Sequence, residues 1–284
     1  MKSGIVDYAL NPYRGCAHDC AYCYASFMNR FSHHDQPWGQ WVDAKVNMAE
    51  ILVKDLRRLS RQRSPGAPRK IEVIISSVTD AYQPAEREYG LTRMCLEVIA
   101  ATVGDGGQLR LGAGGIEQTA AAPPSISFSV LSKSDLVLRD IDVLQDIPGI
   151  EVGMTVTTVD DEITRLYEPG ASPATRRLAA LRRLSEAGFS TWAFISPVLP
   201  YHSDSREAMR SILTDIRDAG VPRIMVDRFN PYPAAVGRFL KVAPAPAGQA
   251  LREYAARPDE YLDRLRDVVM EASVALGVNV ETVF

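Results

Sequence analysis

Hydrophobic residues along the chain follow two alternating spacings. Short runs rich in β-branched residues predict buried strands, and between them apolar residues recur every three or four positions, as on one face of a helix. The predicted strands cover residues 5–10, 71–79, 126–132, 151–158, 190–196 and 223–229. Strands that alternate with helices predict a parallel sheet with crossover helices.

The helical stripes agree with this order of elements. Helix signals flank them, because Ser172 and Pro173 form a good helix start, and Gly188 and Gly220 follow apolar stripes where a terminal glycine is expected. We therefore predict an α/β fold, a partial (β/α)6 TIM-like barrel of parallel strands with outer helices. The stripes are Met48, Ile51, Leu52, Leu56 and Leu59; residues 91–103; Leu178, Leu181 and Leu184; and Leu262, Leu265, Val269, Ala272 and Leu276.

Two segments interrupt the alternation. Residues 104–124 are rich in glycine and alanine, which favours a flexible surface insertion, with a substrate lid as the alternative. Residues 230–249 are rich in Pro, Ala and Gly and are interpreted as a loop before the C-terminal helix. The expected organisation is one domain over 1–284, with its core at about 5–230 and a C-terminal loop and helix at 231–284.

Composition limits the class of protein. The chain has 284 residues, of which 46% are hydrophobic and 24% charged, and a formal net charge of −3. These values are typical of a soluble protein, and no apolar run has the length of a membrane span, so we expect a cytoplasmic location. The charge balance argues against a generally basic nucleic-acid surface. A basic stretch containing Arg57, Arg58, Arg61, Arg63, Arg69 and Lys70 is interpreted as a solvated helix face and connector.

The cysteines carry the strongest chemical signal. Of four, Cys16, Cys20 and Cys23 fall within eight residues, whereas Cys95 lies within a helical apolar stripe and is expected to be buried packing. This clustering does not suit a disulfide framework and predicts reduced thiolates that share one centre. The Cys-x3-Cys-x2-Cys spacing allows each thiolate to bind a different iron of a cubane, which leaves the fourth iron open. Gly15 permits close backbone approach beside the first cysteine.

The motif resembles the signature of the radical S-adenosylmethionine (radical SAM) superfamily. The segment 11–24, NPYRGCAHDCAYCY, is similar to the spore photoproduct lyase-like branch of that superfamily. Further landmarks are residues 78–86 after the second strand, residues 131–134 after the third, and residues 168–170 before the fourth helix. The resemblance spans most of residues 8–230.

The resemblance implies a [4Fe–4S] cluster whose open iron binds S-adenosylmethionine. An electron from the reduced cluster then cleaves this cofactor to methionine and a 5′-deoxyadenosyl radical, which abstracts hydrogen from a substrate. A reductant such as flavodoxin or ferredoxin is the implied partner, no membrane is involved, and the reaction is a lyase or other radical-initiated reaction. Nucleic acid is one alternative for the unidentified substrate.

Side chains at the carboxyl ends of the predicted strands are the candidate cofactor contacts, because barrel enzymes place their sites there. Thr79 and Asp80 offer groups for an ammonium, and Lys133 offers a partner for a carboxylate. Thr155 and Thr157 share one face of their strand and offer hydroxyls to a ribose. One further candidate is Tyr22, which precedes the last cysteine and is placed to lie against adenine. The resemblance also places cofactor contacts at Thr79, Lys133 and Thr155.

An alternative reading of the cysteines is a Cys3His zinc site with His18. His18 lies between two cysteines, so it could join them on one ion only with strain, and a position behind the metal ligands or at the surface is favoured for it. The corresponding alternative function is an iron–sulfur or zinc protein that binds or senses without radical chemistry. The branch resemblance also departs at Ser77, where spore photoproduct lyase has a hydrogen-donating cysteine. A serine O–H bond is too strong for that role, so photoproduct repair is disfavoured.

Several weaker candidates surround the expected site. Arg14 is interpreted either as support for the charge of the cluster or as a surface pair, and Glu168 with Arg177 as an ion pair that orients the fourth loop. The groups that follow the fifth and sixth strands are expected to face the cavity on the substrate side. They are Tyr201, His202, Asp204, Asp227, Arg228 and Asn230.

Overall fold

A seven-stranded parallel sheet forms the centre of the molecule. The computed structural model describes residues 6–61, 70–104 and 125–284, and within them the strand order is β1-β4-β5-β6-β7-β8-β9 without closure into a full barrel. The partial barrel expected from the sequence is therefore confirmed. The strands are β1 (Tyr8–Leu10), β4 (Lys70–Ile75), β5 (Ser125–Ser132), β6 (Glu151–Thr155), β7 (Ser190–Ile195), β8 (Arg223–Val226) and β9 (Val280–Thr282).

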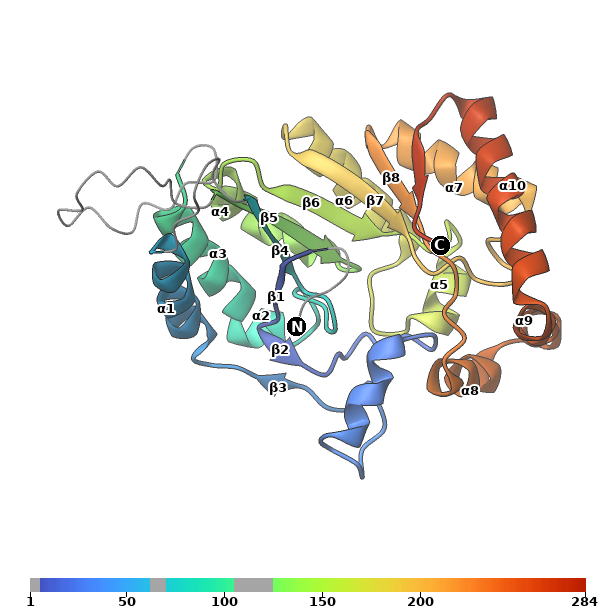
Figure 1. Ribbon diagram of the computed structural model, residues 1–284, viewed down its shortest axis with the longest axis horizontal. Coiled ribbons are helices and arrows are strands. Elements are labelled where there is room, and N and C mark those ends of the chain that lie inside the picture. Colours follow the sequence, from blue (N-terminus) through green and yellow to red (C-terminus); the bar gives the residue numbers. More distant parts are fainter. Residues whose placement is uncertain (1–5, 62–69, 105–124) are drawn as a thin grey trace.

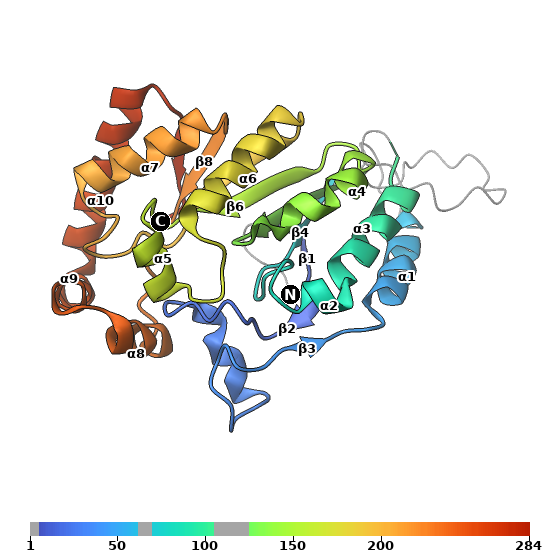
Figure 2. The same ribbon diagram turned by 180° about the vertical axis from the view of Figure 1, so that it is seen from behind.

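Helices cover one face of this sheet. Figure 2 shows α3, α4, α6 and α7 in front of the strands, whereas Figure 1 shows the opposite face without helices over it. The helices are α1 (Met48–Ser60), α2 (Glu86–Tyr89), α3 (Leu91–Thr102), α4 (Ile141–Gln145), α5 (Asp161–Tyr167), α6 (Ala174–Glu186), α7 (Arg206–Asp218), α8 (Pro233–Val242), α9 (Ala245–Ala256) and α10 (Pro258–Leu276), with 3-10 helices η1 (Tyr24–Arg30) and η3 (Asp135–Asp140). A small antiparallel pair, β2 (Tyr13–Arg14) and β3 (Asp43–Ala44), lies beside the sheet.

Strand β5 shows how the sequence separates the two faces. Ile126, Phe128 and Val130 are buried in the core beneath the helices, whereas the intervening Ser127 and Ser129 line a cavity. Successive side chains of a strand point to opposite faces of the sheet. Burial of the three apolar residues under the helices therefore places the two serines on the inner face. The inner face of the partial barrel is consequently more polar than its outer face.

The C-terminal region differs from the sequence interpretation. Residues 230–249 are not a loop, because α8 begins at Pro233 and α9 follows at Ala245. Both helices carry Pro in their first turn, where a missing N–H costs nothing, so the prolines mark helix starts. The short strand β9, which pairs with β8, was also not predicted. Three residues at the chain end give too little periodicity to distinguish a strand from a loop.

Two sequence predictions fall partly or wholly outside the described residues. The surface insertion or lid at 104–124 lies there from residue 105 onward, and so do residues 62–69 of the basic stretch. Of the described part of that stretch, Arg58 pairs with Asp55 and Lys70 pairs with Glu72. As for membranes, none of the helices in the described part of the chain is long and apolar enough to cross a bilayer.

Gly153 in the middle of β6 is expected to tolerate no side chain. A Cβ there would come within 2.2 Å of the Trp192 ring on β7, which is itself only 7% exposed. We expect Gly153→Ala to lower the free energy of unfolding by about 1–3 kcal/mol, because overpacking forces the indole out of place. Urea unfolding measures this. The control is Gly237→Ala in α8, which has open space and should gain up to about 1 kcal/mol. An unchanged midpoint for Gly153→Ala would contradict the packing argument.

Candidate radical SAM site

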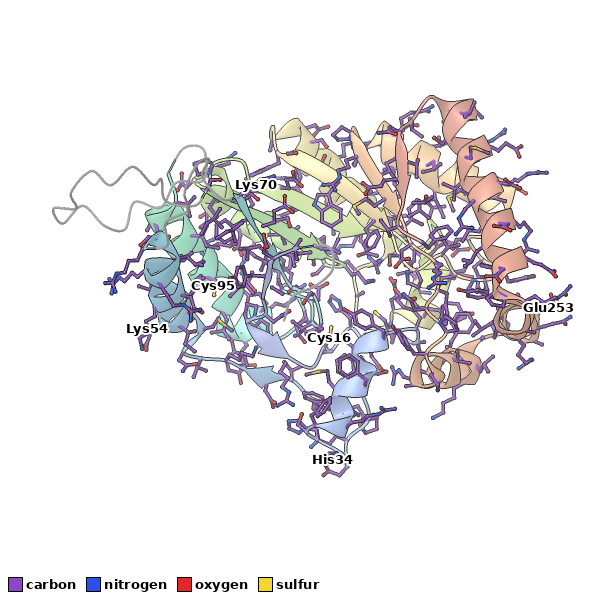
Figure 3. The ribbon with its side chains drawn as sticks, viewed as in Figure 1. Cys16, His34, Lys54, Lys70, Cys95 and Glu253 are labelled. Atoms are coloured by element: carbon purple, nitrogen blue, oxygen red, sulfur yellow. The ribbon has the colours of Figure 1, made fainter. Side chains whose placement is uncertain are left out.

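The three clustered cysteines lie on one loop between β2 and η1. All four cysteines of the chain are free thiols; Cys16 and Cys20 are buried and Cys23 is half-buried. Figure 3 shows Cys16 on this loop, apart from Cys95, which is buried on α3 as predicted. Gly15 has φ +79°, and a Cβ there would come within 2.4 Å of the Trp41 carbonyl oxygen. The close backbone approach expected beside the first cysteine is therefore confirmed.

The chemistry of these thiols suits a cationic iron centre. Burial raises the pKa of Cys16, of Cys20 and of Cys23, and neighbouring thiols raise the pKa of Cys16 and of Cys20 further. Buried thiolates of this kind require a bound cation to balance their charge. No three His, Cys, Asp or Glu side chains of the described ranges are grouped as they would be around a single metal ion. Three thiolates that each bind a different iron of a cubane need no such convergence on one point.

The side chain of His18 contacts Asp80. Its Nδ1 lies 3.4 Å from Oδ2 of Asp80, and the ring is buried. Burial lowers the pKa of His18 to about 4, although the nearby Asp80 carboxylate opposes this shift, so the imidazole is neutral at pH 7. This contact matches the supporting position favoured by the sequence.

Gln83 brackets the first cysteine. Its Oε1 accepts a hydrogen bond from the Ala17 N–H at 2.9 Å, and its Nε2 donates to the Gly15 carbonyl at 3.3 Å and to Thr79 Oγ1 at 2.9 Å. The side chain is fully buried. The residues on either side of Cys16 are thereby fixed by one amide. Sequence reasoning missed Gln83, since its only signal was membership of the 78–86 landmark.

A second segment, residues 167–170, fixes the loop between the other cysteines. Ala21 N–H donates to the Tyr167 carbonyl at 2.8 Å, and Gly170 N–H donates to the His18 carbonyl at 3.1 Å. A Cβ on Gly170 would lie 2.0 Å from the Ala17 carbonyl oxygen. The Glu-Pro-Gly landmark therefore acts as a support whose glycine allows backbone to touch backbone.

Glu168 and Arg177 form the predicted ion pair behind this support. Both side chains are buried, and Arg177 Nη2 donates to Glu168 Oε2. Arg177 also donates to the Ser172 carbonyl at 2.7 Å and to the Thr155 carbonyl at 3.1 Å. Burial raises the pKa of Glu168, and Arg177 opposes that shift. The pair ties the end of β6 to α6 directly beneath the cysteine loop.

The inner face of the sheet holds a cavity of about 500 Å³. Thr155 ends β6, Lys133 directly follows β5, and Thr79 and Asp80 lie on the segment after β4, which ends at Ile75, four residues before the predicted end at Thr79. All four line the cavity, and so does Tyr24, which directly follows the last cysteine. The Lys133 Nζ lies 5.7 Å from the centre of the Tyr22 ring. The cysteine loop therefore borders the cavity.

Both carboxylate oxygens of Asp80 accept hydrogen bonds from the protein itself. Its Oδ1 accepts from Tyr82 N–H and Ser132 Oγ, each at 2.8 Å, and its Oδ2 accepts from Lys133 N–H at 2.8 Å. With His18 also in contact, the carboxylate joins the cysteine loop to β5. These contacts show that Asp80 stabilises the protein structure around the site. They do not support the sequence-based expectation that Asp80 binds the ammonium group of the cofactor.

Tyr22 and Thr157 both contact Glu168. The Tyr22 hydroxyl and the Thr157 hydroxyl donate to the same carboxylate oxygen, the latter at 3.0 Å. Thr155 lines the cavity at the end of β6, whereas Thr157 lies beyond the strand. Thr157 is not among the described residues that line the cavity.

The polar groups expected on the substrate side do not line this cavity. Tyr201 is exposed, His202 contacts the Tyr167 hydroxyl at 3.0 Å, and Asp204 accepts from Tyr261 on α10 at 3.0 Å. Asp227, Arg228 and Asn230 are likewise absent from its lining within the described residues. These loops pack against the C-terminal helices, an arrangement that depends on the helices that the sequence did not reveal.

Removing the Gln83 amide is expected to loosen the cysteine loop. Gln83→Leu deletes three buried hydrogen bonds and leaves the Ala17 N–H and the Gly15 carbonyl without that partner. We expect a loss of about 2–4 kcal/mol in unfolding free energy, at about 1 kcal/mol per bond, and a lower iron content after reconstitution. Urea unfolding and iron analysis measure these. The control is Gln249→Leu, which changes an exposed glutamine in α9. If the two variants had the same unfolding free energy and the same iron content, the role of Gln83 in holding the cysteine loop would be refuted.

Sequence comparison identifies the family. The profile described as the Radical SAM superfamily matches residues 10–213, which include the cysteine loop, Gln83 and the Glu168–Arg177 pair. The chain belongs to the radical SAM superfamily. Relatives include an uncharacterized protein of Methanocaldococcus jannaschii, 34% identical over 68% of this chain and 61% of its own length. An uncharacterized protein of Mycobacterium tuberculosis is 28% identical over 77% of this chain and 57% of its own length. The chain thus spans about three fifths of these relatives.

Solved structures share the radical SAM fold. A spore photoproduct lyase complexed with dinucleoside spore photoproduct superposes with a TM-score of 0.65 at 14% identity, covering 99% of this chain and 77% of that one. Streptococcus suis SuiB bound to its precursor peptide gives a TM-score of 0.56 at 14% identity, covering 97% and 47%. At such identities the likeness concerns the fold alone.

Proposed function

We propose that this radical SAM protein is an enzyme that reductively cleaves S-adenosylmethionine and abstracts hydrogen from a substrate. The observation that carries the proposal is the placement of three free thiols on a loop that borders the cavity of the partial barrel. Cys16, Cys20 and Cys23 would hold a [4Fe–4S] cluster. When bound and reduced, the cluster supplies the electron that cleaves the C–S bond of S-adenosylmethionine to give a 5′-deoxyadenosyl radical.

The cavity residues would bind and orient the cofactor. Lys133 offers its ammonium to the carboxylate of S-adenosylmethionine, Thr79 supports its amino group, and Thr155 offers a hydroxyl to the ribose. Behind them, Asp80, Tyr22 and Thr157 hold the backbone of β5, the cysteine loop and the turn after β6 in place. Pre-organised supports of this kind keep binding groups at fixed geometry, which radical chemistry in a water-poor site requires.

Anaerobic reconstitution tests the proposal. The protein is loaded with iron and sulfide, reduced with dithionite and mixed with S-adenosylmethionine, and 5′-deoxyadenosine is quantified by chromatography. Formation of 5′-deoxyadenosine and methionine in equal amounts is expected. Its absence from protein that carries about four irons and four sulfides per chain would overturn the proposal. About one zinc per chain without sulfide would instead support a zinc-binding protein.

A further inference from the structure

Helix α8 reaches across to the cysteine loop. In Figure 1 it lies beside η1, and the two elements are in contact. Arg238 on this helix directs its guanidinium at the loop. Its Nη2 donates to Asp19 Oδ1 at 2.5 Å and to the Asp19 and Cys20 carbonyls at 3.4 Å each, and its Nη1 donates to the Trp38 carbonyl at 3.5 Å.

The partner of Arg238 is held in an uncommon backbone conformation. Asp19 has φ +51°, in the left-handed region that non-glycine residues rarely adopt. A Cβ on Gly39 would lie 2.2 Å from its carboxyl group, so the opposite wall of the loop also closes on Asp19. One planar guanidinium thus joins the cysteine loop to the segment at Trp38, which lies after η1 and about twenty residues further along the chain. Lysine presents a single point charge and cannot reproduce this fork.

Arg238 also carries a permanent charge close to two cysteines. Its Nη2 lies 3.4 Å from the carbonyl of Cys20 itself, and its side chain is only 23% exposed. The reduced state of a neighbouring cluster carries one more negative charge than its oxidised state. A partly buried positive charge therefore stabilises the reduced state more. Charges and hydrogen bonds around an iron–sulfur cluster influence its reduction potential, and stabilising the reduced state raises that potential. The helix lies beyond residues 10–213, so the family profile does not include it.

We propose that Arg238 is a positioning residue that anchors the cysteine loop and raises the reduction potential of the cluster held there. This inference rests on the proposed function, because it presupposes the cluster. It gives the C-terminal region a definite role, because α8 supplies a guanidinium that donates to Asp19 and Cys20 from outside the strand-helix repeat.

Three variants test the proposal. Arg238→Gln removes charge and fork, Arg238→Lys keeps the charge, and Lys241→Gln removes an exposed charge from the same helix as a matched control. The reconstituted proteins are compared by spectroscopic redox titration and by the half-life of the cluster under a chelator. Thermal unfolding of the cluster-free proteins reports folding separately.

At the wild-type midpoint we expect Arg238→Gln to hold about a tenfold lower ratio of reduced to oxidised cluster, which is about 59 mV for one electron. Arg238→Lys should keep a near wild-type potential but lose the cluster several-fold faster to chelator. Lys241→Gln should match wild type in both. A potential for Arg238→Gln equal to that of Lys241→Gln would overturn the proposal. If Arg238→Gln does not fold, Arg238→Lys decides, and a wild-type cluster half-life in that variant would overturn the anchoring role.

Failure of this inference and failure of the proposed function are distinguishable. Wild-type protein that makes 5′-deoxyadenosine while its Arg238 variants keep potential and cluster half-life would overturn the inference alone. Wild-type protein that assembles no cluster would overturn both.

Discussion

Replacing Cys20 with alanine is expected to lower 5′-deoxyadenosine formation by at least about 100-fold. Loss of a contact behind a metal ligand already costs 10–100-fold in affinity or activity, and Cys20 is proposed to be one of only three protein ligands. Iron and sulfide content after reconstitution and the rate of 5′-deoxyadenosine release are the measurements. The same change at Cys16 or Cys23 should have the same effect, because each thiolate is proposed to bind a different iron.

Cys95→Ala is the matched control for this experiment. Cys95 is fully buried on α3, so its loss should cost about 1 kcal/mol of stability while cluster content and 5′-deoxyadenosine formation stay at the wild-type level. Full activity in Cys20→Ala would contradict the assignment of the ligands. Loss of activity in Cys95→Ala with an intact fold would show that the division of the cysteines into three ligands and one packing residue is wrong.

Arg177→Met is expected to be the most destabilising of the single substitutions considered. It removes the counter-charge of buried Glu168 together with donors to the Ser172 and Thr155 carbonyls. Breaking a buried pair leaves one charge without compensation, and we expect a loss of about 3–5 kcal/mol in unfolding free energy. Because the pair supports the Glu-Pro-Gly segment under the cysteine loop, iron retention should fall as well. Urea unfolding and iron analysis measure both effects.

The neighbouring Arg176 provides the control. Arg176 is 61% exposed and pairs with Asp135, whose side chain is 14% exposed and also accepts a hydrogen bond from Ser172 Oγ, so Arg176→Met should cost only about 1 kcal/mol. A double variant, Arg177→Met with Glu168→Gln, should recover part of the loss because the uncompensated charge is gone. If Arg177→Met and Arg176→Met were equally stable, the buried pair would have no special role in the fold.

Local patterns were sufficient for much of the fold. The strands from β4 to β8 were predictable because their β-branched runs are buried on one or both faces, and α1, α3, α6 and α10 carry continuous apolar stripes. Helices α8 and α9 were not, since their Pro, Ala and Gly content hides the stripe on which Ala235, Phe239, Ala247 and Leu251 are buried. Strand β9 derives its place from pairing with β8, a contact that no local window contains.

The residues of the candidate site also differ in whether local sequence features reveal them. The thiol spacing and the residues that follow strands are local features of the sequence, so Cys16, Cys20, Cys23, Thr79 and Lys133 could be named as candidates from it, and Thr79 and Lys133 line the cavity. The supports were not. Gln83 and Arg238 come from 66 and 219 positions away along the chain and meet the cysteine loop only in the folded molecule.

The sequence by itself determined that three thiols on one short segment follow the first strand of a strand-helix repeat, and with it the superfamily. Only the tertiary structure decided which polar groups face the cavity and which support the loop. The reason is physical: the spacing of ligands is set by a few covalent bonds, whereas the partner of a buried carboxylate or amide is set by what the fold brings within about 3 Å. Asp80 shows the difference, because its place at a strand end was predictable but its use as an internal hydrogen-bond acceptor was not.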